Sequence, residues 1–383
     1  MIIVEIKKFL TKFTPVISVI IPKKKKLWVF GCWFGRLYSD NAKYLFEYIN
    51  KSHPDIECVW LTRNYSVKQE VEKRGYKCYK RFSLKGLLCA LRAEVAFTTS
   101  DEIPDLSPFI NRNHTKVVQL YHGIAGKGTN IYLSKKDAID TRKRFNKYYW
   151  ISTSNKYSDV FSKGFGIDRN RLFVTGYPRN DTFVTKPYSE KISEIRLKFP
   201  NSKMIIYMPT HRGYGKRPID VTEFGAINEK LKEHNILMVY KPHYMELKNV
   251  LKNGIENYTN IIIAHDQEIW GDPYEYIHNF DLLISDYSSI VYDFLCADKP
   301  IVLYTYDLEY MRINDFGIMD YYETNPPGPF CYSWEETLNQ VVTLLENDIW
   351  HEKRNTCREM FHPFDDGKNS ERVYNLAIKV TSK

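Results

Sequence analysis

Short apolar runs alternate with helix-like segments along most of this chain, and this alternation restricts its fold more than any other feature. Each run has roughly four to eight residues and stops at turn or polar residues, which is typical of a parallel strand buried on both faces. Helical segments between such strands indicate βαβ units around a parallel sheet. The expected strands are residues 26–31, 57–62, 95–100, 116–123, 171–178, 203–210, 236–243, 260–265, 282–286 and 300–304, and the clearest expected helices are residues 41–52, 290–297 and 370–381.

The 383 residues are enough for two domains of ordinary size. We expect an α/β chain with two Rossmann-like domains, residues 26–187 and 188–383, joined by a hinge between residues 177 and 200. One option for the final helix is that it packs back on the first domain. Two parallel sheets that face a central cleft would direct both sets of strand ends into it. This is the GT-B arrangement of nucleotide-sugar enzymes, and the analogy is one of architecture.

The chain favours a partner with negative charge, because its net charge is +9. Residues 1–25 form a basic amphipathic segment that closes with the run Lys23–Lys26. Lys12 and Pro15 interrupt the apolar core that a signal peptide needs, and no stretch reaches the ~18–20 apolar residues of a membrane span. We expect this segment to lie on an anionic membrane surface, with a solvated arm as the alternative.

Neither the cysteines nor the carboxylates indicate a metal site. The seven cysteines are odd in number and include no CxxC pair, so we expect reduced thiols rather than disulfides or a zinc site. No Asp-x-Asp pair occurs, so the sequence does not suggest a bound metal of the kind that many nucleotide-sugar enzymes use. No cofactor is expected, although Mg²⁺ remains an option. No signature of a nucleic-acid module is present, and nucleic acid is not an expected partner.

Five predicted strands end in polar residues of an unusual kind. The endings read YHGIAGKG, GYPRND, MPTHR, YKPHY and SDYSS. Ligands of open α/β sheets bind beyond the carboxyl ends of the strands, where these residues lie. Ser288 and Ser289 also precede a predicted helix, and the free amides of a helix N-terminus favour phosphate. An ordinary capped helix is the alternative for those two serines.

These segments resemble those of the CDP-glycerol glycerophosphotransferase family, the teichoic acid primases and polymerases. The matching pieces are HG with a following lysine, GYPRND, PTHR, KPH, SDYSSIVYDF and the earlier GRLYSDNAKYLFEYI, so the resemblance runs from about Lys26 to the C-terminus. Each segment alone is weak evidence of this resemblance, whereas the whole set in this order is specific to the family. Two departures are the loop GIAGKG, where the family often has a shorter Thr-Pro-Leu-Lys-like run, and Tyr244, where proline is common.

The resemblance implies a transferase that moves glycerol phosphate from CDP-glycerol to an acceptor hydroxyl and releases CMP. It implies a lipid-linked glycan or polyol-phosphate acceptor, in teichoic acid or capsule synthesis for the cell wall. It also implies a cytoplasmic, peripheral location on the inner face of the cell membrane, with residues 26–187 on the acceptor side and 188–383 binding the donor. CDP-ribitol as donor, or a GT-B glycosyltransferase that uses a nucleotide-sugar, remain alternatives. The oligomeric state is not indicated.

The resemblance further implies roles for the residues at the strand ends. The acceptor needs a general base that titrates near neutral pH, and His122 beside Gly123 is the candidate. His243 is the candidate partner of the donor phosphates, and these two roles are exchangeable. Asp286 is the third catalytic candidate, to orient a histidine or to bind hydroxyls, with a structural role as the alternative. The donor-binding candidates are Pro209, Thr210, Arg212, Lys241, Ser288, Ser289, Ser370 and Arg372.

Four further residues have two readings each. Arg179, Asn180 and Asp181 suit either a network that stabilises the hinge or contact with substrate. Lys127 suits either phosphate binding or a solvated loop. The donor-binding candidates at the start of the last helix have helix capping as their alternative.

Overall fold

The structure is a computed structural model that describes residues 21–111, 114–124, 126, 142–143, 145–212, 223–243, 246–247, 250, 258–265, 267–313 and 317–382. The described residues form two compact units. Unit 1 takes them from Met1–His122, Leu133–Asp181 and Asp366–Lys383, and unit 2 takes them from Gly123–Tyr132 and Thr182–Asp365. Most of the predicted N-terminal segment lies outside the described residues.

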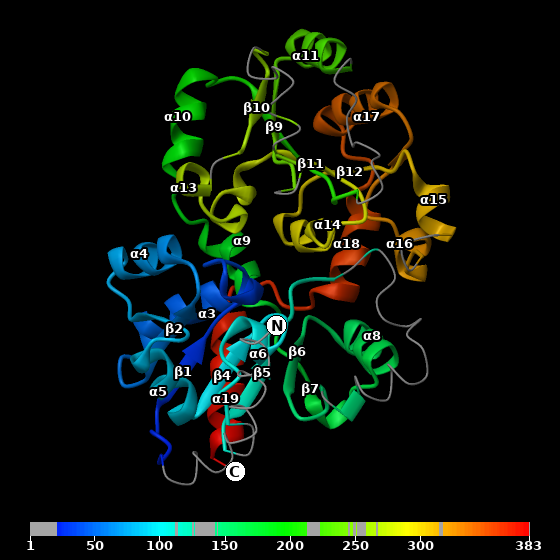
Figure 1. Ribbon diagram of the computed structural model, residues 1–383. Coiled ribbons are helices and arrows are strands. Elements are labelled where there is room, and N and C mark those ends of the chain that lie inside the picture. The colour runs from blue at the N-terminus through cyan, green and yellow to red at the C-terminus, as the bar shows by residue number, and fades with distance from the viewer. Residues whose placement is uncertain are drawn as a thin grey trace. The chain divides into compact units, whose positions relative to one another are not determined.

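Among the described residues, unit 1 contains one sheet of seven strands in the order β3-β2-β1-β4-β5-β6-β7 (Figure 1). All of its strand pairs are parallel. The order reverses between β1 and β4, which is the switch point where ligands of such sheets bind. The strands are β1 (Leu27–Phe30), β2 (Glu57–Thr62), β3 (Cys78–Lys80), β4 (Val95–Thr98), β5 (Lys116–Gln119), β6 (Tyr149–Ser152) and β7 (Leu172–Val174).

Unit 2 repeats this plan, with six described strands in the order β10-β9-β8-β11-β12-β13. These pairs are parallel as well, and the switch point lies between β8 and β11. The strands are β8 (Lys203–Met208), β9 (Ile236–Tyr240), β10 (Ile261–Ile263), β11 (Leu282–Ser285), β12 (Ile301–Tyr304) and β13 (Phe330–Cys331).

Helices connect the strands in both units. Those of unit 1 are η1 (Trp33–Gly35), α3 (Asp40–Ser52), α4 (Tyr65–Lys73), α5 (Leu84–Arg92), α6 (Glu102–Asp105), α8 (Asn155–Phe165), η2 (Arg169–Arg171), η3 (Pro178–Asp181) and α19 (Asn369–Thr381). Those of unit 2 are α9 (Thr182–Thr185), α10 (Glu190–Lys198), α11 (Phe224–Glu233), α13 (Gln267–Trp270), η6 (Pro273–Glu275), η7 (Ile277–Asn279), α14 (Ile290–Phe294), η8 (Leu295–Ala297), α15 (Leu308–Ile313), α16 (Asp320–Thr324), α17 (Trp334–Glu346) and α18 (His351–Phe361). In the part of the chain that the structure describes, no helix has both the length and the apolar character of a membrane span.

The central strands are buried along their whole length, which explains why they read as unbroken apolar runs. Every residue of β1, β4, β11 and β12 is buried. A strand covered by helices on both faces has no polar side to alternate with. The predicted α/β fold with two parallel, Rossmann-like sheets is therefore confirmed. Several strands end a few residues before their predicted ends, because the polar residues that follow leave the sheet.

The division into units differs from the predicted domains in two places. The boundary falls after Asp181 instead of after residue 187, and the described part of residues 123–132 belongs to unit 2. Helix α19 belongs to unit 1, which is the option named for the final helix. The side chain of Asp181 explains the position of α19, because its carboxylate accepts hydrogen bonds from the amides of Asn369 and Ser370, both at 2.8 Å. The ring of Tyr374 on α19 also stacks on that of His53, which follows α3, with the ring centroids 3.6 Å apart.

This capping predicts a stability effect. Replacing a capping carboxylate by alanine costs a helix about 1 kcal/mol, so we expect Asp181→Ala to lower the free energy of unfolding of unit 1 by about that amount. Glu371→Ala, in the exposed first turn of the same helix, is the control and should change it by a few tenths. Urea unfolding followed by tryptophan fluorescence measures both variants. Equal shifts would contradict the assigned cap.

Candidate functional site

A buried arginine joins three neighbouring strand ends of unit 2. Arg212 follows β8, Asp286 follows β11 and Asp307 follows β12. Arg212 Nε donates to Asp307 Oδ2 at 2.7 Å, and Arg212 Nη2 lies 2.8 Å from Asp286 Oδ2. All three residues are at most 4% exposed. The ion pairs therefore fix the loops at the switch point of this sheet.

Two aromatic rings and the main chain complete the surroundings of Arg212. Its guanidinium carbon lies 5.2 Å from the ring centroid of Tyr287 and 5.7 Å from that of Tyr306, both within cation–π range. Nη1 donates to the carbonyl oxygen of Thr210 at 2.9 Å. Burial opposes the charged form of Arg212, but the carboxylates of Asp286 and Asp307 raise the pKa of its guanidinium above the ordinary value. Arg212 thus stays charged and holds the strand ends together.

Asp286 also binds Thr210. The amide of Thr210 donates to both carboxylate oxygens at 3.0 Å, and the hydroxyl of Thr210 donates to Asp286 Oδ1. Among the described residues, the carboxylate of Asp286 contacts Thr210 and Arg212 and no histidine. The structure therefore favours a positioning role for Asp286 over the predicted orientation of a histidine.

Exposure separates the predicted residues of unit 2 into two sets. Pro209, Arg212 and Asp286 are buried and shape the loops. The others are partly exposed at the strand ends, so a ligand can reach them: Thr210, Lys241, His243, Ser288 and Ser289. Burial lowers the pKa of the Lys241 ammonium group, an effect that Asp272 opposes. Direct donor contact stays a prediction, and exposure favours it for the second set over the side chain of Arg212, which is 3% exposed.

Ser288 and Ser289 cap their helix less well than the sequence suggests. Helix α14 begins at Ile290 and has five residues, and its N-cap Ser289 adopts helical dihedral angles without a capping side-chain hydrogen bond. The hydroxyl of Ser288 accepts from the amide of Ile290 at 3.4 Å, which is a long bond. A helix this short supplies little dipole, so only the two hydroxyls and the local amides support the predicted phosphate site.

His243 has a neighbour that was not among the predicted site residues. The ring of His211 stacks on it, with centroids 5.2 Å apart and an angle of 24° between the planes. His211 Nδ1 in turn lies 2.8 Å from Glu246 Oε1. The strand ends of β8 and β9 therefore bring two imidazoles and a carboxylate together.

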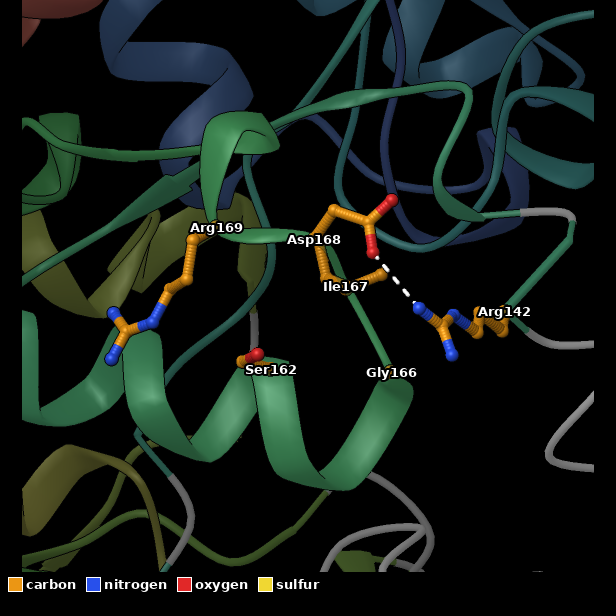
Figure 2. Close-up of a pocket in the computed structure, with 6 residues that line it drawn as sticks. All are labelled: Arg142, Ser162, Gly166, Ile167, Asp168 and Arg169. Atoms are coloured by element: carbon orange, nitrogen blue, oxygen red, sulfur yellow. Dashed lines mark hydrogen bonds and ion pairs between the residues drawn. The ribbon is translucent and has the colours of Figure 1, made fainter.

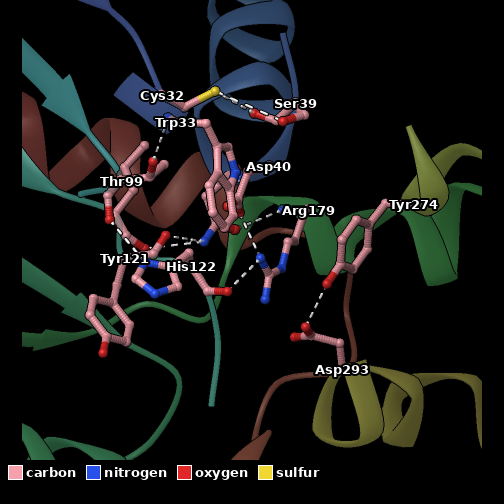
Figure 3. A network of polar contacts seen from close by, with 12 residues as sticks. Cys32, Trp33, Ser39, Asp40, Thr99, Tyr121, His122, Arg179, Tyr274 and Asp293 are labelled. Carbon is pink, nitrogen blue, oxygen red and sulfur yellow. Dashed lines mark hydrogen bonds and ion pairs between the residues drawn. The ribbon is translucent and has the colours of Figure 1, made fainter. Parts of the chain in front are cut away.

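In unit 1, the side chain of His122 lies beyond the end of β5 and is partly exposed (Figure 3). Its Nδ1 is 3.3 Å from the carbonyl oxygen of Thr99, and its ring lies between Tyr121 and Trp33, with centroid distances of 4.4 and 5.6 Å. A carbonyl oxygen only accepts, so this contact requires the hydrogen on Nδ1 and leaves the lone pair on Nε2. Gly123 follows at φ 136°, a conformation that favours glycine.

Arg179 fixes the main chain of His122. Its Nη1 donates to the carbonyl oxygen of His122 at 3.1 Å and to Asp40 Oδ1 at 2.6 Å (Figure 3). Arg179 and Asp40 are 3% and 4% exposed in this ion pair. Trp33 Nε1 donates to the second oxygen of Asp40 at 3.0 Å, and Asp40 itself has a left-handed φ of 63°. The contacts favour a structural network for Arg179 over direct contact with substrate.

A second buried carboxylate organises the switch point of unit 1. Asp105 accepts from the amides of Phe34, Thr99 and Ser100 and from the hydroxyl of Thr98, at 2.6–3.0 Å. Burial raises the pKa of Asp105, while these four donors lower it. The carboxylate therefore ties the loop after β1 to the end of β4, whose Thr99 carbonyl meets His122.

The remaining predicted residues of unit 1 serve its internal structure. Asn180 is buried, and Asp181 caps α19, where burial raises the pKa of its carboxyl group and the helix donors lower it. Ser370 is 3% exposed beneath this cap, and Arg372 forms an ion pair with Asp366. These contacts favour the helix-capping alternative for Ser370, and the predicted donor contacts of both residues stay predictions. Lys127 lies outside the described residues.

Two other features do not add to these sites. No cluster of three or more potential metal ligands occurs among the described residues. A cavity of about 240 Å³ in unit 1 lies at the end of α8 (Figure 2) and is lined by Arg142, Ser162, Gly166, Ile167, Asp168 and Arg169. It contains no predicted residue, and Arg142 on its wall forms an ion pair with Asp168 at 3.1 Å.

Several residues that the structure brings to these strand ends were not among the predicted site residues, although His211 belongs to the predicted strand ending MPTHR. They are Trp33, Asp40, Asp105, His211, Glu246 and Asp307. Trp33, His211 and Asp307 follow β1, β8 and β12 within a few residues, so position after a strand was an available signal. No sequence pattern indicated which of them pair across strands.

Comparison with known proteins indicates the family of the chain. A family model described as CDP-Glycerol:Poly(glycerophosphate) glycerophosphotransferase matches residues 14–379. The teichoic acid poly(glycerol phosphate) polymerase of Bacillus subtilis (strain 168) is 28% identical over 390 residues, which are 94% of this chain but 50% of that protein. The chain thus spans half the length of that relative. The teichoic acid glycerol-phosphate transferase of Staphylococcus aureus (strain NCTC 8325 / PS 47) is 26% identical over 376 residues, which are 93% of each chain.

A solved structure supports the fold. The structure of the wall teichoic acid polymerase TagF has a TM-score of 0.78 and 22% sequence identity, covering 94% of this chain and 90% of that chain. At this identity the similarity concerns the fold alone. It supports the GT-B-like class, while the predicted cleft between the sheets stays a prediction.

The buried cluster around Arg212 predicts a large stability effect. Removing the shared guanidinium leaves the carboxylates of Asp286 and Asp307 buried without their counter-charge, and breaking a buried ion pair in this way costs about 3–5 kcal/mol. We expect Arg212→Met to lower the free energy of unfolding of unit 2 by about 3 kcal/mol. The matched control is Arg312→Met, which removes the exposed partner of Glu309 and should change it by less than about 1 kcal/mol. Urea unfolding checks both, and a small effect of Arg212→Met would contradict the structural role of the cluster.

Proposed function

Because the chain belongs to the CDP-glycerol:poly(glycerophosphate) glycerophosphotransferase family, we propose that it transfers glycerol phosphate from CDP-glycerol to an acceptor hydroxyl. The acceptor oxygen attacks the phosphorus that carries glycerol, and the bond from this phosphorus to the oxygen of CMP breaks. CMP leaves with the bonding electrons, and the hydroxyl proton passes to a base. Such a reaction depends mainly on positioning and on electrostatic stabilisation of the phosphoryl group.

The geometry of His122 is the observation that carries this proposal. A general base needs a lone pair at a partly exposed position. The contact between Nδ1 and the carbonyl oxygen of Thr99 leaves that lone pair on Nε2, and Arg179 holds the main chain of His122 in place. His122 therefore acts as the base for the acceptor hydroxyl in this proposal.

The partly exposed residues of unit 2 receive the donor in this proposal. Diphosphate oxygens need hydrogen-bond donors and positive charge. Thr210, Ser288 and Ser289 offer hydroxyl groups, and Lys241 and His243 offer nitrogen donors at neighbouring strand ends. The buried cluster of Arg212, Asp286 and Asp307 keeps these loops in position. No metal ion has a part in this proposal.

The acceptor and the location belong to the same proposal. We propose a lipid-linked glycan or polyol phosphate as acceptor, in the synthesis of teichoic acid or a capsule-like polymer. Such an acceptor lies in the cytoplasmic membrane, so the protein would work peripherally on its inner face. The basic segment before Lys26 supports this location, because clustered lysines bind anionic lipids.

Substituting the two histidines tests the proposed roles. Loss of a general base costs about 10²–10⁴-fold in rate, so we expect His122→Ala to lower CMP release from CDP-glycerol by that factor. His243→Ala should weaken donor binding and raise the KM for CDP-glycerol. His351→Ala is the matched control, since His351 is half exposed on α18. The assay measures CMP in the presence of a membrane-lipid extract.

The outcomes distinguish the alternatives. Unchanged CMP release in both His122→Ala and His243→Ala would refute the roles assigned to these two histidines. Release of CMP with CDP-ribitol but not with CDP-glycerol would retain the mechanism and change the donor. Release of nucleotide from a UDP- or GDP-sugar alone would indicate a glycosyltransferase.

A further inference from the structure

The loop after β1 contains a turn of left-handed backbone. Trp33, Phe34 and Gly35, which form η1, have φ angles of 45°, 60° and 68°. Glycine adopts this region freely, but the other residues clash with their own main chain there and adopt it one at a time. Two successive aromatic residues with left-handed φ are therefore strained. The contacts around the turn must hold it in this conformation.

Hydrogen bonds to α6 and to the end of β2 hold this turn. The amide of Phe34 donates to Asp105 Oδ1 at 2.7 Å. The carbonyl oxygen of Gly35 accepts from the amide of Arg63 at 2.8 Å and from the hydroxyl group of Thr62 at 2.9 Å. A strained conformation persists only where its surroundings impose it, and such conformations gather at functional sites. The side chain that the turn places indicates what that function is.

The turn places the indole of Trp33 beside the imidazole of His122. The ring centroids are 5.6 Å apart with an angle of 54° between the planes, and Trp33 Nε1 donates to Asp40 Oδ2 at 3.0 Å (Figure 3). The imidazole also stacks on the ring of Tyr121, with centroids 4.4 Å apart, and its Nδ1 is 3.3 Å from the carbonyl oxygen of Thr99. Because the bond to Asp40 fixes the indole, the indole in turn limits rotation of the imidazole.

Strained residues of the main chain gather around His122. Among the residues that the structure describes, eight other than glycine have left-handed φ angles, between 44° and 63°. Four of these belong to the turn or to the contacts around the imidazole: Trp33, Phe34, Asp40 and Tyr121. The other four lie singly elsewhere in the chain. Strain is thus concentrated at the residue proposed as the base.

We propose that Trp33 is a positioning residue for His122. Its indole keeps the imidazole in the orientation in which Nδ1 meets the carbonyl oxygen of Thr99, so the hydrogen stays on Nδ1 and the lone pair on Nε2. Trp33 itself does not touch the reacting atoms. Its effect on catalysis rests on the proposed function, whereas the orientation of the imidazole is a property of the chain alone.

Long-range proton–nitrogen NMR of the histidine rings tests the proposal in the full chain without substrate. It shows which ring nitrogen carries the hydrogen in slightly alkaline buffer, where histidine is neutral, and His122→Ala identifies the signals. We expect the hydrogen on Nδ1 in the wild type and a shift of population towards Nε2 in Trp33→Gly. Glycine suits the left-handed φ of this position, so the variant removes the ring without straining the turn. Trp33→Phe, which retains a ring, should keep the wild-type signals.

The matched control replaces another left-handed residue by glycine. Lys186 is exposed in unit 2 and has a φ of 44°, so Lys186→Gly should leave the signals of His122 unchanged. In the assay of CMP release, Trp33→Gly should lower kcat by about 10–10²-fold, because misplacement of a catalytic group costs rate of this order. The KM for CDP-glycerol should not change, and Trp33→Phe should restore most of the rate.

Three results would overturn the proposal. They are unchanged signals of His122 in Trp33→Gly, an equal change in Lys186→Gly, and no restoration by Trp33→Phe. If circular dichroism shows that Trp33→Gly does not fold, Trp33→Leu takes its place with the same expected result. Absence of CMP release by the wild type would refute the proposed function, and the NMR result would still decide the role of Trp33.

Discussion

The ion pairs of Arg212 are the interaction on which the arrangement of unit 2 depends most. Loops after three parallel strands would otherwise be free to move apart, because strand ends carry no sheet hydrogen bonds to hold them. One guanidinium bonded to Asp286 and Asp307 joins all three. A buried pair of this kind adds little net stability but is costly to break, so it specifies the geometry of the loops. The partly exposed groups around it are thereby held in fixed positions.

Unit 1 uses the same device at its own strand ends. Arg179 is buried against Asp40 and holds the carbonyl oxygen of His122, while the imidazole stays partly exposed. In both units a buried arginine–aspartate pair supports loops that present a histidine. The rigid part of each site is thus charged and hidden, and the part that can meet substrate is small and polar. This division fits phosphoryl transfer, in which positioning supplies much of the rate.

The sequence predicted the elements well because buried parallel strands leave a strong signal. The runs 57–62 and 282–286 correspond closely to β2 and β11. Strands β3, β6 and β13 were missed; β3 and β13 are edge strands of three and two residues that are only partly buried, so they leave no apolar run in the sequence. The strand-end residues were also found, but their roles were less accessible. The sequence predicted that Arg212 and Ser370 bind the donor. Only three-dimensional packing shows that Arg212 is bonded to Asp307 and that Ser370 is buried under Asp181.

The identity of the nucleotide released from CDP-glycerol tests the central claim most directly. The wild-type chain would be incubated with CDP-glycerol and a membrane-lipid extract, and the products separated by chromatography and identified by phosphorus NMR. Transfer of glycerol phosphate breaks the bond between the two phosphates, so the account predicts CMP and a new phosphodiester on the acceptor. Formation of CDP would mean that the bond to glycerol breaks instead, and would contradict a phosphotransferase.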